Sequence, residues 1–349
     1  MTSVSVCVPV FNGMPYLARC LDSISAQTAL PDEVLLVDDG STDGSLELCQ
    51  AFVAAHDGAR LVCNPVNLGL TANWQRCLEL ASSEWVKFVF QDDWLESRCL
   101  EVFRSAVVPG VDLVLGARRY EYASGVDEPV RRAYEQSRQE SAARLGPARR
   151  LVTPEDLAVE VRHWGSWNFL GEPVATMIRR SAAVDLGGFS PHFVVLSDYV
   201  YLLRLALRGG FVWVPDELTG FLVHEASTSA RLRASFRVTV LEPLAFYLSL
   251  LQEPELAIAR PRSTPTYLAA VRYLAADGLH RARLADPPAT AAWESLRDDM
   301  VLGELLRSWK LEHRGLSHRL SRRWRHRGGR THDHLRVLSP GTASMLPPD

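Results

Sequence analysis

Two adjacent carboxylates, Asp92 and Asp93, follow the mostly apolar run 85–90 after a single residue, Gln91. An apolar run that stops abruptly at a polar turn is typical of a buried β-strand, so the pair is expected at a strand's carboxyl end. Mg²⁺ and Mn²⁺ take carboxylate oxygens, and need few protein ligands when substrate phosphates complete the shell. The alternative is a pair that caps a helix beginning near Leu95. We favour the metal, because an uncompensated acidic pair at a buried strand end is costly.

Two earlier apolar runs also end in polar turns. The run 4–9 leads to Asn12, and the run 34–37 leads to Asp38 and Asp39. Such runs alternate with helical patterns of about a dozen residues, which indicates βαβ units and a mostly parallel sheet. Ligands of such sheets bind outside the carboxyl ends of the strands. The pair at 38–39 could bind a ribose, a base amide or a metal, or form an Asx-turn that caps the next helix.

Two further candidates lie in the second half of the chain. Asp198 opens a helical pattern that Gly209 and Gly210 end. It is either a capping residue or a general base within hydrogen-bond reach of an acceptor hydroxyl. His224 follows a short apolar run, and taken alone it is better explained as a satisfied surface histidine than as a metal ligand.

The alternation of strands and helices is interrupted after the fifth strand pattern. Residues 123–150 are rich in Arg, Glu, Ser and Pro and poor in large apolar groups, which predicts a surface insertion. Two separate short strands are predicted at 212–214 and 218–223.

Composition and missing motifs exclude several classes of protein. The net charge is -3, so nothing favours binding to nucleic acid. The chain has neither the Gly-x4-Gly-Lys-Ser/Thr phosphate loop nor a Gly-x-Gly-x-x-Gly turn after its first strand. It also lacks the Gly-x-Ser-x-Gly elbow of α/β-hydrolases.

The cellular compartment is predicted from the N-terminus, the hydropathy and the cysteines. The N-terminus has no basic region ahead of its apolar run, and no apolar run approaches the roughly 18–20 residues that span a bilayer. The 6 cysteines form no Cys-x-x-Cys pair and are expected to be small buried side chains in a reducing compartment. We therefore expect a cytoplasmic protein, or one on the cytoplasmic face of the membrane.

The motifs, taken in order, resemble those of family 2 glycosyltransferases with the GT-A fold, over about residues 3–230. The first half matches at Val8-Pro9-Val10-Phe11-Asn12, Val37-Asp38-Asp39-Gly40-Ser41-Thr42-Asp43, Asn67-Leu68-Gly69 with Asn73, and Gln91-Asp92-Asp93. The second half matches at Gly171-Glu172-Pro173 with Met177, Gly187-Gly188-Phe189, Ser197-Asp198 with Arg204, Gly209-Gly210, and His224. The resemblance implies an α/β fold with a Rossmann-like, mostly parallel sheet flanked by helices.

The resemblance also implies roles for single residues. The nucleotide-sugar would be bound by Pro9, Phe11, Asn12, Asp39, Asn67, Gly69, Asn73, Gln91 and Asp92. The metal, Mg²⁺ or Mn²⁺, would lie on Asp92 and Asp93, with His224 completing its shell, and Asp198 would be the general base. Phe90 stands where the family often has another carboxylate, so metal dependence is expected to be weaker than usual.

The chain beyond residue 230 has a different character. Helical patterns dominate residues 231–336, and residues 337–349 resemble a disordered tail. Within 305–327, tryptophans and leucines at helical spacing alternate with arginines, which suits either an anionic membrane surface or packing against the domain. We predict a GT-A domain at 1–230, with a nucleotide-sugar half at about 1–120 and an acceptor half at about 150–230. The helical region would shape the acceptor site, form a homodimer or contact the membrane.

The predicted activity is the inverting transfer of one sugar from a UDP- or dTDP-sugar to an acceptor hydroxyl. Two alternatives stay open at this point. A nucleotidyltransferase would use similar acids, but should have a Gly-rich first loop with a lysine, which 10–13 does not provide. A non-catalytic scaffold would bind a nucleotide-sugar without releasing its diphosphate.

Overall fold

The computed structural model describes residues 2–190, 193–232 and 242–260. These residues belong to two compact units, the first comprising Met1–Leu157 and Phe169–Ser227 and the second Ala158–Asn168 and Thr228–Asp349. Of the predicted helical region 231–336, only 231–232 and 242–260 are described. The basic segment 305–327 and the predicted tail 337–349 lie outside the described residues.

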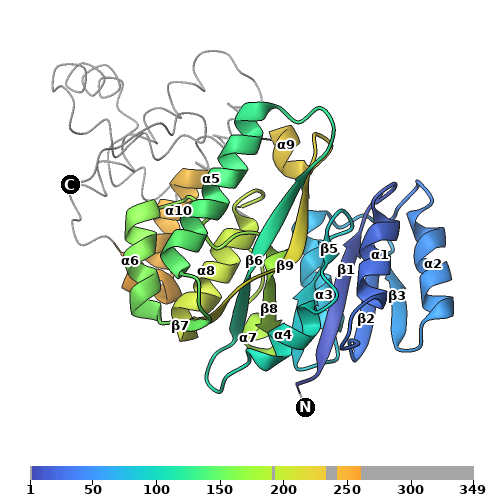
Figure 1. Ribbon diagram of the computed structural model, residues 1–349, viewed down its shortest axis with the longest axis horizontal. Coiled ribbons are helices and arrows are strands. Elements are labelled where there is room, and N and C mark those ends of the chain that lie inside the picture. Colours follow the sequence, from blue (N-terminus) through green and yellow to red (C-terminus); the bar gives the residue numbers. More distant parts are fainter. Residues whose placement is uncertain (1, 191–192, 233–241, 261–349) are drawn as a thin grey trace. The chain divides into compact units, whose positions relative to one another are not determined.

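The first unit is built on one nine-stranded sheet, with strand order β3-β2-β1-β4-β8-β6-β9-β5 and β7 paired to β9 (Figure 1). The strands are β1 (Val4–Val10), β2 (Glu33–Asp38), β3 (Ala59–Cys63), β4 (Trp85–Phe88), β5 (Trp94–Leu95), β6 (Leu113–Tyr122), β7 (Arg150–Val152), β8 (Thr176–Arg179) and β9 (Phe211–Val223). Strands β3, β2, β1 and β4 are all parallel, as the βαβ pattern predicts. Beyond β4 the sheet is mixed, because β8, β5 and β7 are antiparallel to their neighbours while β6 and β9 are parallel.

Helices cover both faces of the parallel half. They are α1 (Leu17–Ser25), α2 (Ser45–Ala55), α3 (Leu70–Leu80) and α4 (Cys99–Ser105). Successive side chains of a strand point to opposite faces, so Val6 and Val8 join one apolar cluster with α1, α2 and α4. Cys7 lies on the other face against α3, where its Sγ is 3.9 Å from the carbonyl oxygen of Cys77.

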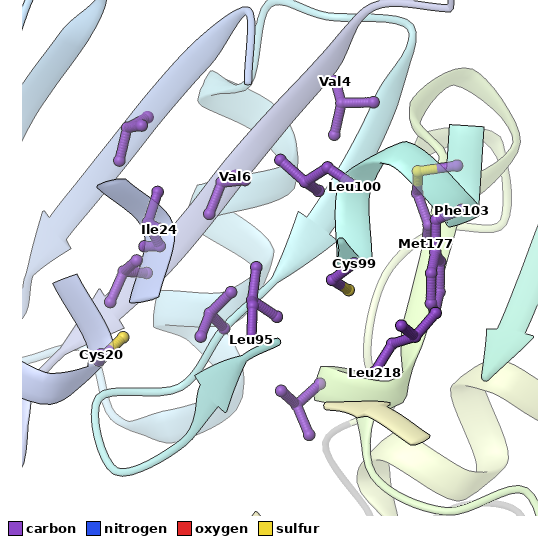
Figure 2. Close-up of a cluster of buried hydrophobic side chains, with 14 of the residues drawn as sticks. Val4, Val6, Cys20, Ile24, Leu95, Cys99, Leu100, Phe103, Met177 and Leu218 are labelled. Atoms are coloured by element: carbon purple, nitrogen blue, oxygen red, sulfur yellow. The ribbon is translucent and has the colours of Figure 1, made fainter. Parts of the chain in front are cut away.

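The apolar cluster also joins the two halves of the sheet. Figure 2 shows Val6 of β1 and Ile24 of α1 with Leu95 of β5, Phe103 of α4 and Met177 of β8. All of these side chains are almost fully removed from solvent. Burial of a large apolar side chain contributes about 1.5–3 kcal/mol to the stability of the fold. This cluster therefore stabilises the sheet from whose strands the strand-end loops extend.

The segment 123–150, predicted as a surface insertion, is largely helical, because α5 (Glu128–Leu145) occupies most of it, and nearly all of its side chains are exposed or half-buried. The helix begins with a proline in its first turn and buries only Ser141 and Leu145, so it has little of the apolar stripe that reveals a helix in a sequence. Its ordering comes from tertiary contact, since the ring of Tyr134 packs edge-on against Tyr120 of β6, with centroids 4.9 Å apart.

The two strands predicted at 212–214 and 218–223 are one strand, β9. Its pairing with β6 shifts register around Ala117, which lies opposite Glu217 while Gly116 lies opposite Val214. The extra residues on β9 form a bulge, and a bulge breaks the apolar pattern without ending the strand.

The remaining helices lie in the second half of the described chain. They are α6 (Pro154–Trp164), η1 (Pro173–Ala175), α7 (Arg180–Asp185), α8 (Ser197–Gly209), α9 (Thr228–Leu232), α10 (Glu242–Gln252) and η3 (Pro254–Ala259). In the second unit, Phe246 and Leu250 of α10 and Leu256 of η3 are buried, and Arg260 donates to the carbonyl of Leu250. None of the helices within the described ranges is long and apolar enough to cross a membrane.

Candidate active site

The polar ends of β1, β2 and β4 meet at one edge, because these strands are parallel neighbours. The loop after β1 is joined to the loop after β2 by hydrogen bonds. The Asn12 amide donates to Ser41 Oγ at 3.0 Å, and the Asn12 side-chain oxygen accepts from the Thr42 amide at 2.8 Å. Asn12 has a φ of 49°, a left-handed conformation that Asn tolerates better than most residues.

Asp39 is the centre of a buried polar network. Its Oδ1 accepts hydrogen bonds from Asn64 Nδ2 and from the Leu68 amide, both at 2.8 Å. Its Oδ2 accepts from the Gly69 amide at 2.9 Å, and Asn67 Nδ2 donates to its main-chain carbonyl at 3.0 Å. The loop after β3 therefore wraps around the Asp39 carboxylate, which is fixed in one orientation.

Asp38 and Asn73 support this network. Asp38 Oδ2 accepts from the Gly40 and Ser41 amides at 3.1 and 3.2 Å, so Asp38 forms the Asx-turn of the alternative but does not cap α2, whose N-cap is Gly44. Asn73 is buried, with its side-chain oxygen 3.0 Å from Asn64 Nδ2 and its amide donating to a carbonyl of β2. Asn73 thus reaches the site through Asn64.

Gln91 fastens the turn after β4 to the loop after β1. Its Oε1 accepts from the Phe11 amide at 2.8 Å, and its Nε2 donates to the Phe11 carbonyl at 3.0 Å. A Cβ added to Gly13 would lie 2.8 Å from Gln91 Oε1, so glycine leaves room for this amide. Both polar ends of Gln91 are thereby used on Phe11, whose ring remains 46% exposed.

The fold brings His224 to Asp92, across 132 positions of sequence. His224 Nε2 lies 3.0 Å from Asp92 Oδ2, and both side chains are partly or largely buried, with relative exposures of 8% and 25%. The Tyr16 ring lies against the imidazole, with centroids 4.8 Å apart. The pairing of β5 with β9 makes this meeting possible, since it places the turn at 90–93 beside the end of β9. The helix predicted near Leu95 as an alternative is wrong, because Leu95 lies in β5.

Asp93 differs from Asp92 in its surroundings. It is buried, and its Oδ1 accepts from the Leu222 amide of β9 at 3.2 Å. Burial and the neighbouring Asp92 carboxylate raise its pKa well above the usual range. Asp92 therefore presents the more accessible carboxylate, and Asp93 ties the turn to β9.

The donor set at Asp92 fits a hard divalent cation in part. A carboxylate oxygen and an imidazole nitrogen lie together, and both Asp93 Oδ2 and His224 Nδ1 are buried atoms without a hydrogen-bond partner among the described residues. No group of three or more His, Cys, Asp or Glu side chains within the described ranges is arranged to hold a metal. A cation here would need oxygens from a bound diphosphate to complete its shell.

Asp198 lies in the first turn of α8, as predicted, and its Oδ1 is 2.6 Å from the Tyr199 amide. An acid at this place is stabilised by the positive end of the helix dipole. Two turns further along α8, Arg204 donates to the carbonyls of Leu186 and Gly188, which holds the turn that precedes the helix.

Two features of the site were not predicted. The first is Tyr16. No sequence pattern marked this residue, because its contact with His224 depends on tertiary structure alone. The second feature is the ion pair of Arg118 and Glu172, whose charged atoms lie 2.5 Å apart and in which Arg118 is 3% exposed. Arg118 also donates a hydrogen bond to the Tyr120 hydroxyl, which in turn donates to Glu172. A glutamate between Gly171 and a proline was visible in the sequence, but its partner was not. Gly171 has a φ of 88°, and a Cβ there would lie 2.3 Å from Arg118 Cζ.

Comparison with known proteins identifies the class. The family model for glycosyl transferase family 2 matches residues 5–167. An uncharacterized protein of Mycobacterium tuberculosis is 33% identical over 256 residues, or 72% of this chain and 76% of that protein. Glycosyltransferase GlyA of Streptococcus pneumoniae is 39% identical over 114 residues, or 32% of this chain and only 16% of GlyA.

Solved structures show the same fold at low identity. S. aureus TarS in complex with UDP-GlcNAc aligns with a TM-score of 0.59 at 17% identity, over 85% of this chain and 80% of that one. Mannosyltransferase PcManGT from Pyrobaculum calidifontis, in complex with GDP-Man and Mn²⁺, aligns with a TM-score of 0.52 at 21% identity, over 88% and 79%. The mixed sheet with its strand-end acids is thus a GT-A glycosyltransferase fold. The chain belongs to glycosyl transferase family 2 and is a glycosyltransferase.

Proposed function

We propose that the protein transfers one sugar from a nucleoside-diphosphate sugar to an acceptor hydroxyl, with inversion at the anomeric carbon. The observation that carries the proposal is the meeting of Asp92 and His224, 3.0 Å apart, at the sheet edge that also presents Asp39. The structural neighbours contain UDP-GlcNAc, UDP and GDP-Man, which supports a nucleotide-sugar donor. UDP- and dTDP-sugars are the proposed donors.

The nucleoside would lie between the loops after β1, β2 and β3. Pro9, Asn12, Asp39, Asn67 and Gly69 belong to those loops or to the strand that ends there, and Phe11 presents an exposed ring. Asn73 and Gln91 would act indirectly, the first through Asn64 and Asp39 and the second through the backbone of Phe11.

Asp92 and His224 would hold Mg²⁺ or Mn²⁺, with Asp93 fixing the turn on which Asp92 lies. The cation, when bound, would stabilise the negative charge of the leaving nucleoside diphosphate. The chain's own part is to bring a carboxylate and an imidazole together beside the nucleoside loops and to bury them enough to strengthen their charge interactions.

Asp198 would accept the proton of the acceptor hydroxyl as its oxygen attacks the anomeric carbon. A single displacement from the face opposite the diphosphate inverts that carbon. No acid on the protein is needed to protonate the diphosphate, since it leaves as a stable anion. The Tyr199 amide donates to the Asp198 carboxylate and holds it in the first turn of α8.

Residues 1–230 would form the GT-A domain, with the nucleotide half at about 1–120 and the acceptor half at about 150–230. The region from 231 would shape the acceptor site or form a homodimer, and 305–327 would contact the inner face of an anionic membrane. We accordingly propose a cytoplasmic or peripheral location.

The test is release of nucleoside diphosphate from UDP-GlcNAc, UDP-glucose, UDP-galactose, dTDP-glucose and GDP-mannose. Water and a set of p-nitrophenyl glycosides serve as acceptors, with Mn²⁺, Mg²⁺ or EDTA. Asp198→Asn should bind the donor normally and lose transfer by about a hundredfold or more. Asp185→Asn, the same change at an exposed site on α7, is the matched control and should be fully active. Full activity of Asp198→Asn would exclude the base, and binding of donors without release of diphosphate would indicate a scaffold.

A further inference from the structure

We propose that Phe189 is a positioning residue, whose ring fixes the helix carrying Asp198 relative to the turn carrying Asp92. The proposal rests on the function proposed above for Asp198. Phe189 follows the Gly187-Gly188 turn, and its apolar ring can form neither an ion pair nor a conventional hydrogen bond with the two acids. Its effect would therefore pass through the aromatic side chains that it touches.

The Phe189 ring lies between rings from two different helices. It stacks on Tyr201 of α8, with centroids 4.2 Å apart and an angle of 26° between the planes. It also meets Trp74 of α3 edge-on, with centroids 5.4 Å apart at 71°. Aromatic pairs in these geometries are attractive beyond their buried area. Phe189 is thus the direct link between α3 and α8 in this row of rings.

The row continues to the acidic turn. Trp74 also packs on Phe90, with centroids 4.8 Å apart, and Phe90 is two residues before Asp92. Tyr201 lies three residues after Asp198 on α8, so the two belong to the same face of the helix one turn apart. Phe90, Trp74, Phe189 and Tyr201 therefore form a continuous row from the proposed metal-binding turn to the first turn of the base-carrying helix.

The backbone of the turn is held between the same two helices. Arg204 of α8 donates to the carbonyl of Leu186 at 2.9 Å and to that of Gly188 at 3.4 Å. A Cβ on Gly188, which has a φ of 87°, would lie 2.7 Å from Gln75 Oε1 of α3. The ring of Phe189 is consequently presented from a backbone that has little room to move, as a spacer between α3 and α8 requires.

The two neighbours of Phe189 in the row, Tyr201 and Trp74, lie in anchored segments. The Tyr201 hydroxyl donates to the Ala183 carbonyl of α7 at 2.7 Å, and Tyr201 is 1% exposed. Next to Trp74, Asn73 donates to the carbonyl of Val37 on β2. A loss of the Phe189 ring would thus be felt as a change in the spacing between α8 and the sheet, because neither neighbour can move into the gap without breaking its own contacts.

The test compares Phe189→Ala and Phe189→Leu with wild type, using the donor of highest turnover from the panel above. Phe189→Ala should lower kcat by about a hundredfold, the loss typical of a misplacement of about 1 Å, while KM for the donor and Kd for UDP stay at wild-type values. Phe189→Tyr, which keeps the ring, should restore kcat. Phe189→Leu keeps most of the volume and guards against failure to fold; its kcat should fall by about tenfold.

Phe52→Ala is the matched control for lost packing. Phe52 lies on α2 and stacks on His56, the residue that follows this helix, with ring centroids 4.0 Å apart, and neither is one of the four rings of the row. This variant should lose thermal stability as Phe189→Ala does and keep kcat. A double variant, Phe189→Ala with Asp198→Asn, should be no less active than Asp198→Asn alone, since a positioning residue has nothing left to position.

Three results would overturn the proposal. They are a wild-type kcat in Phe189→Ala, a rise in donor KM that accounts for its whole loss, and multiplicative losses in the double variant. If Asp198→Asn is inactive, either of the first two results would refute the role of Phe189 and leave Asp198 as the proposed base. A fully active Asp198→Asn would refute the proposed base, whatever the Phe189 variants do.

Discussion

Asn64 offers a direct test of how the nucleoside side of the site is held. Its side-chain nitrogen donates to Asp39 Oδ1 at 2.8 Å and to the Asn73 side-chain oxygen at 3.0 Å, in a buried position. Asn64→Asp keeps the shape of the side chain and replaces this donor with a carboxylate oxygen. The new charge would then face the Asp39 carboxylate at hydrogen-bond distance.

The size of the effect follows from two competing outcomes. Two unit charges separated by the 2.8 Å of the present contact repel by about 6 kcal/mol at an effective dielectric constant of about 20. Retaining a proton on the introduced carboxyl at pH 7 costs only about 4 kcal/mol, from an unperturbed pKa of about 3.9. The protonated form keeps one of the two hydrogen bonds and loses the other, for about 1 kcal/mol more. We expect a loss of about 5 kcal/mol in the free energy of unfolding at pH 7.

The loss should depend on pH in a defined direction. The introduced carboxyl has a folded-state pKa above its unfolded value, so the folded protein binds a proton that the unfolded chain releases. Stability therefore falls as the pH rises above about 4, and the loss at pH 5 should be only about 2.5 kcal/mol.

Urea denaturation followed by tryptophan fluorescence at pH 5 and pH 7 measures both values. Asn67→Asp is the matched control, because Asn67 also donates to Asp39, at 3.0 Å, but to the main-chain carbonyl and from an exposed position. It should cost less than about 1 kcal/mol, with little change between the two pH values. Equal stabilities of the two variants, or a loss in Asn64→Asp that is the same at both pH values, would refute the buried network around Asp39.

Three further predictions concern the scaffold of the site. Burial lowers the pKa of Lys87, which donates to the carbonyls of Phe88 and Val174, to about 8. As the pH rises, the folded protein therefore loses this proton before the unfolded chain does. Relative to Lys87→Met, the free energy of unfolding of wild type should rise by about 3 kcal/mol between pH 8 and about pH 10.4, as measured by urea titrations. Parallel pH profiles of the two proteins would contradict this. Gly220→Ala should cost about 1–3 kcal/mol in thermal melts, because its Cβ would lie 1.9 Å from Trp94 Cε2, whereas Gly209→Ala, with its nearest atom at 3.5 Å, should be neutral. Glu172→Ala should cost about 3–5 kcal/mol, since it leaves the Arg118 guanidinium buried without its carboxylate, whereas Glu128→Ala, in an exposed pair with Arg132, should cause no measurable change.

The parallel half of the sheet was predictable because its signals are local. Each strand of β1, β2 and β4 is a short apolar run, and each ends in a polar turn that the chain itself displays. The rule that parallel strands present their carboxyl ends together then brings Asn12, Asp39 and Asp92 to one edge. The structure confirms this edge, with hydrogen bonds that join all three strand-end loops.

The second half was less predictable because its elements depend on distant partners. α5 has few buried apolar residues, and β9 contains a bulge that resembles a chain break. β5 has two residues, too few for any periodicity, and exists only because β9 lies beside it. Arg118 and Glu172 likewise look unremarkable until the fold buries them together.

The different roles of Asp92 and Asp93 also follow from their contacts with the end of β9. The main chain of β9 reaches Asp93, through the Leu222 amide, and two residues later the His224 side chain reaches Asp92. The end of one strand therefore contacts both acids, holding one inside the fold and leaving the other beside an imidazole at the open edge. Nothing in the sequence distinguishes two adjacent aspartates. The contacts made at the end of β9, 129 and 132 residues later, make Asp93 the tether of the turn and Asp92 the candidate ligand. A substitution in β9 that shifted its register would alter both contacts at once, so the proposed metal site and the junction between the two halves of the sheet depend on the same pairing.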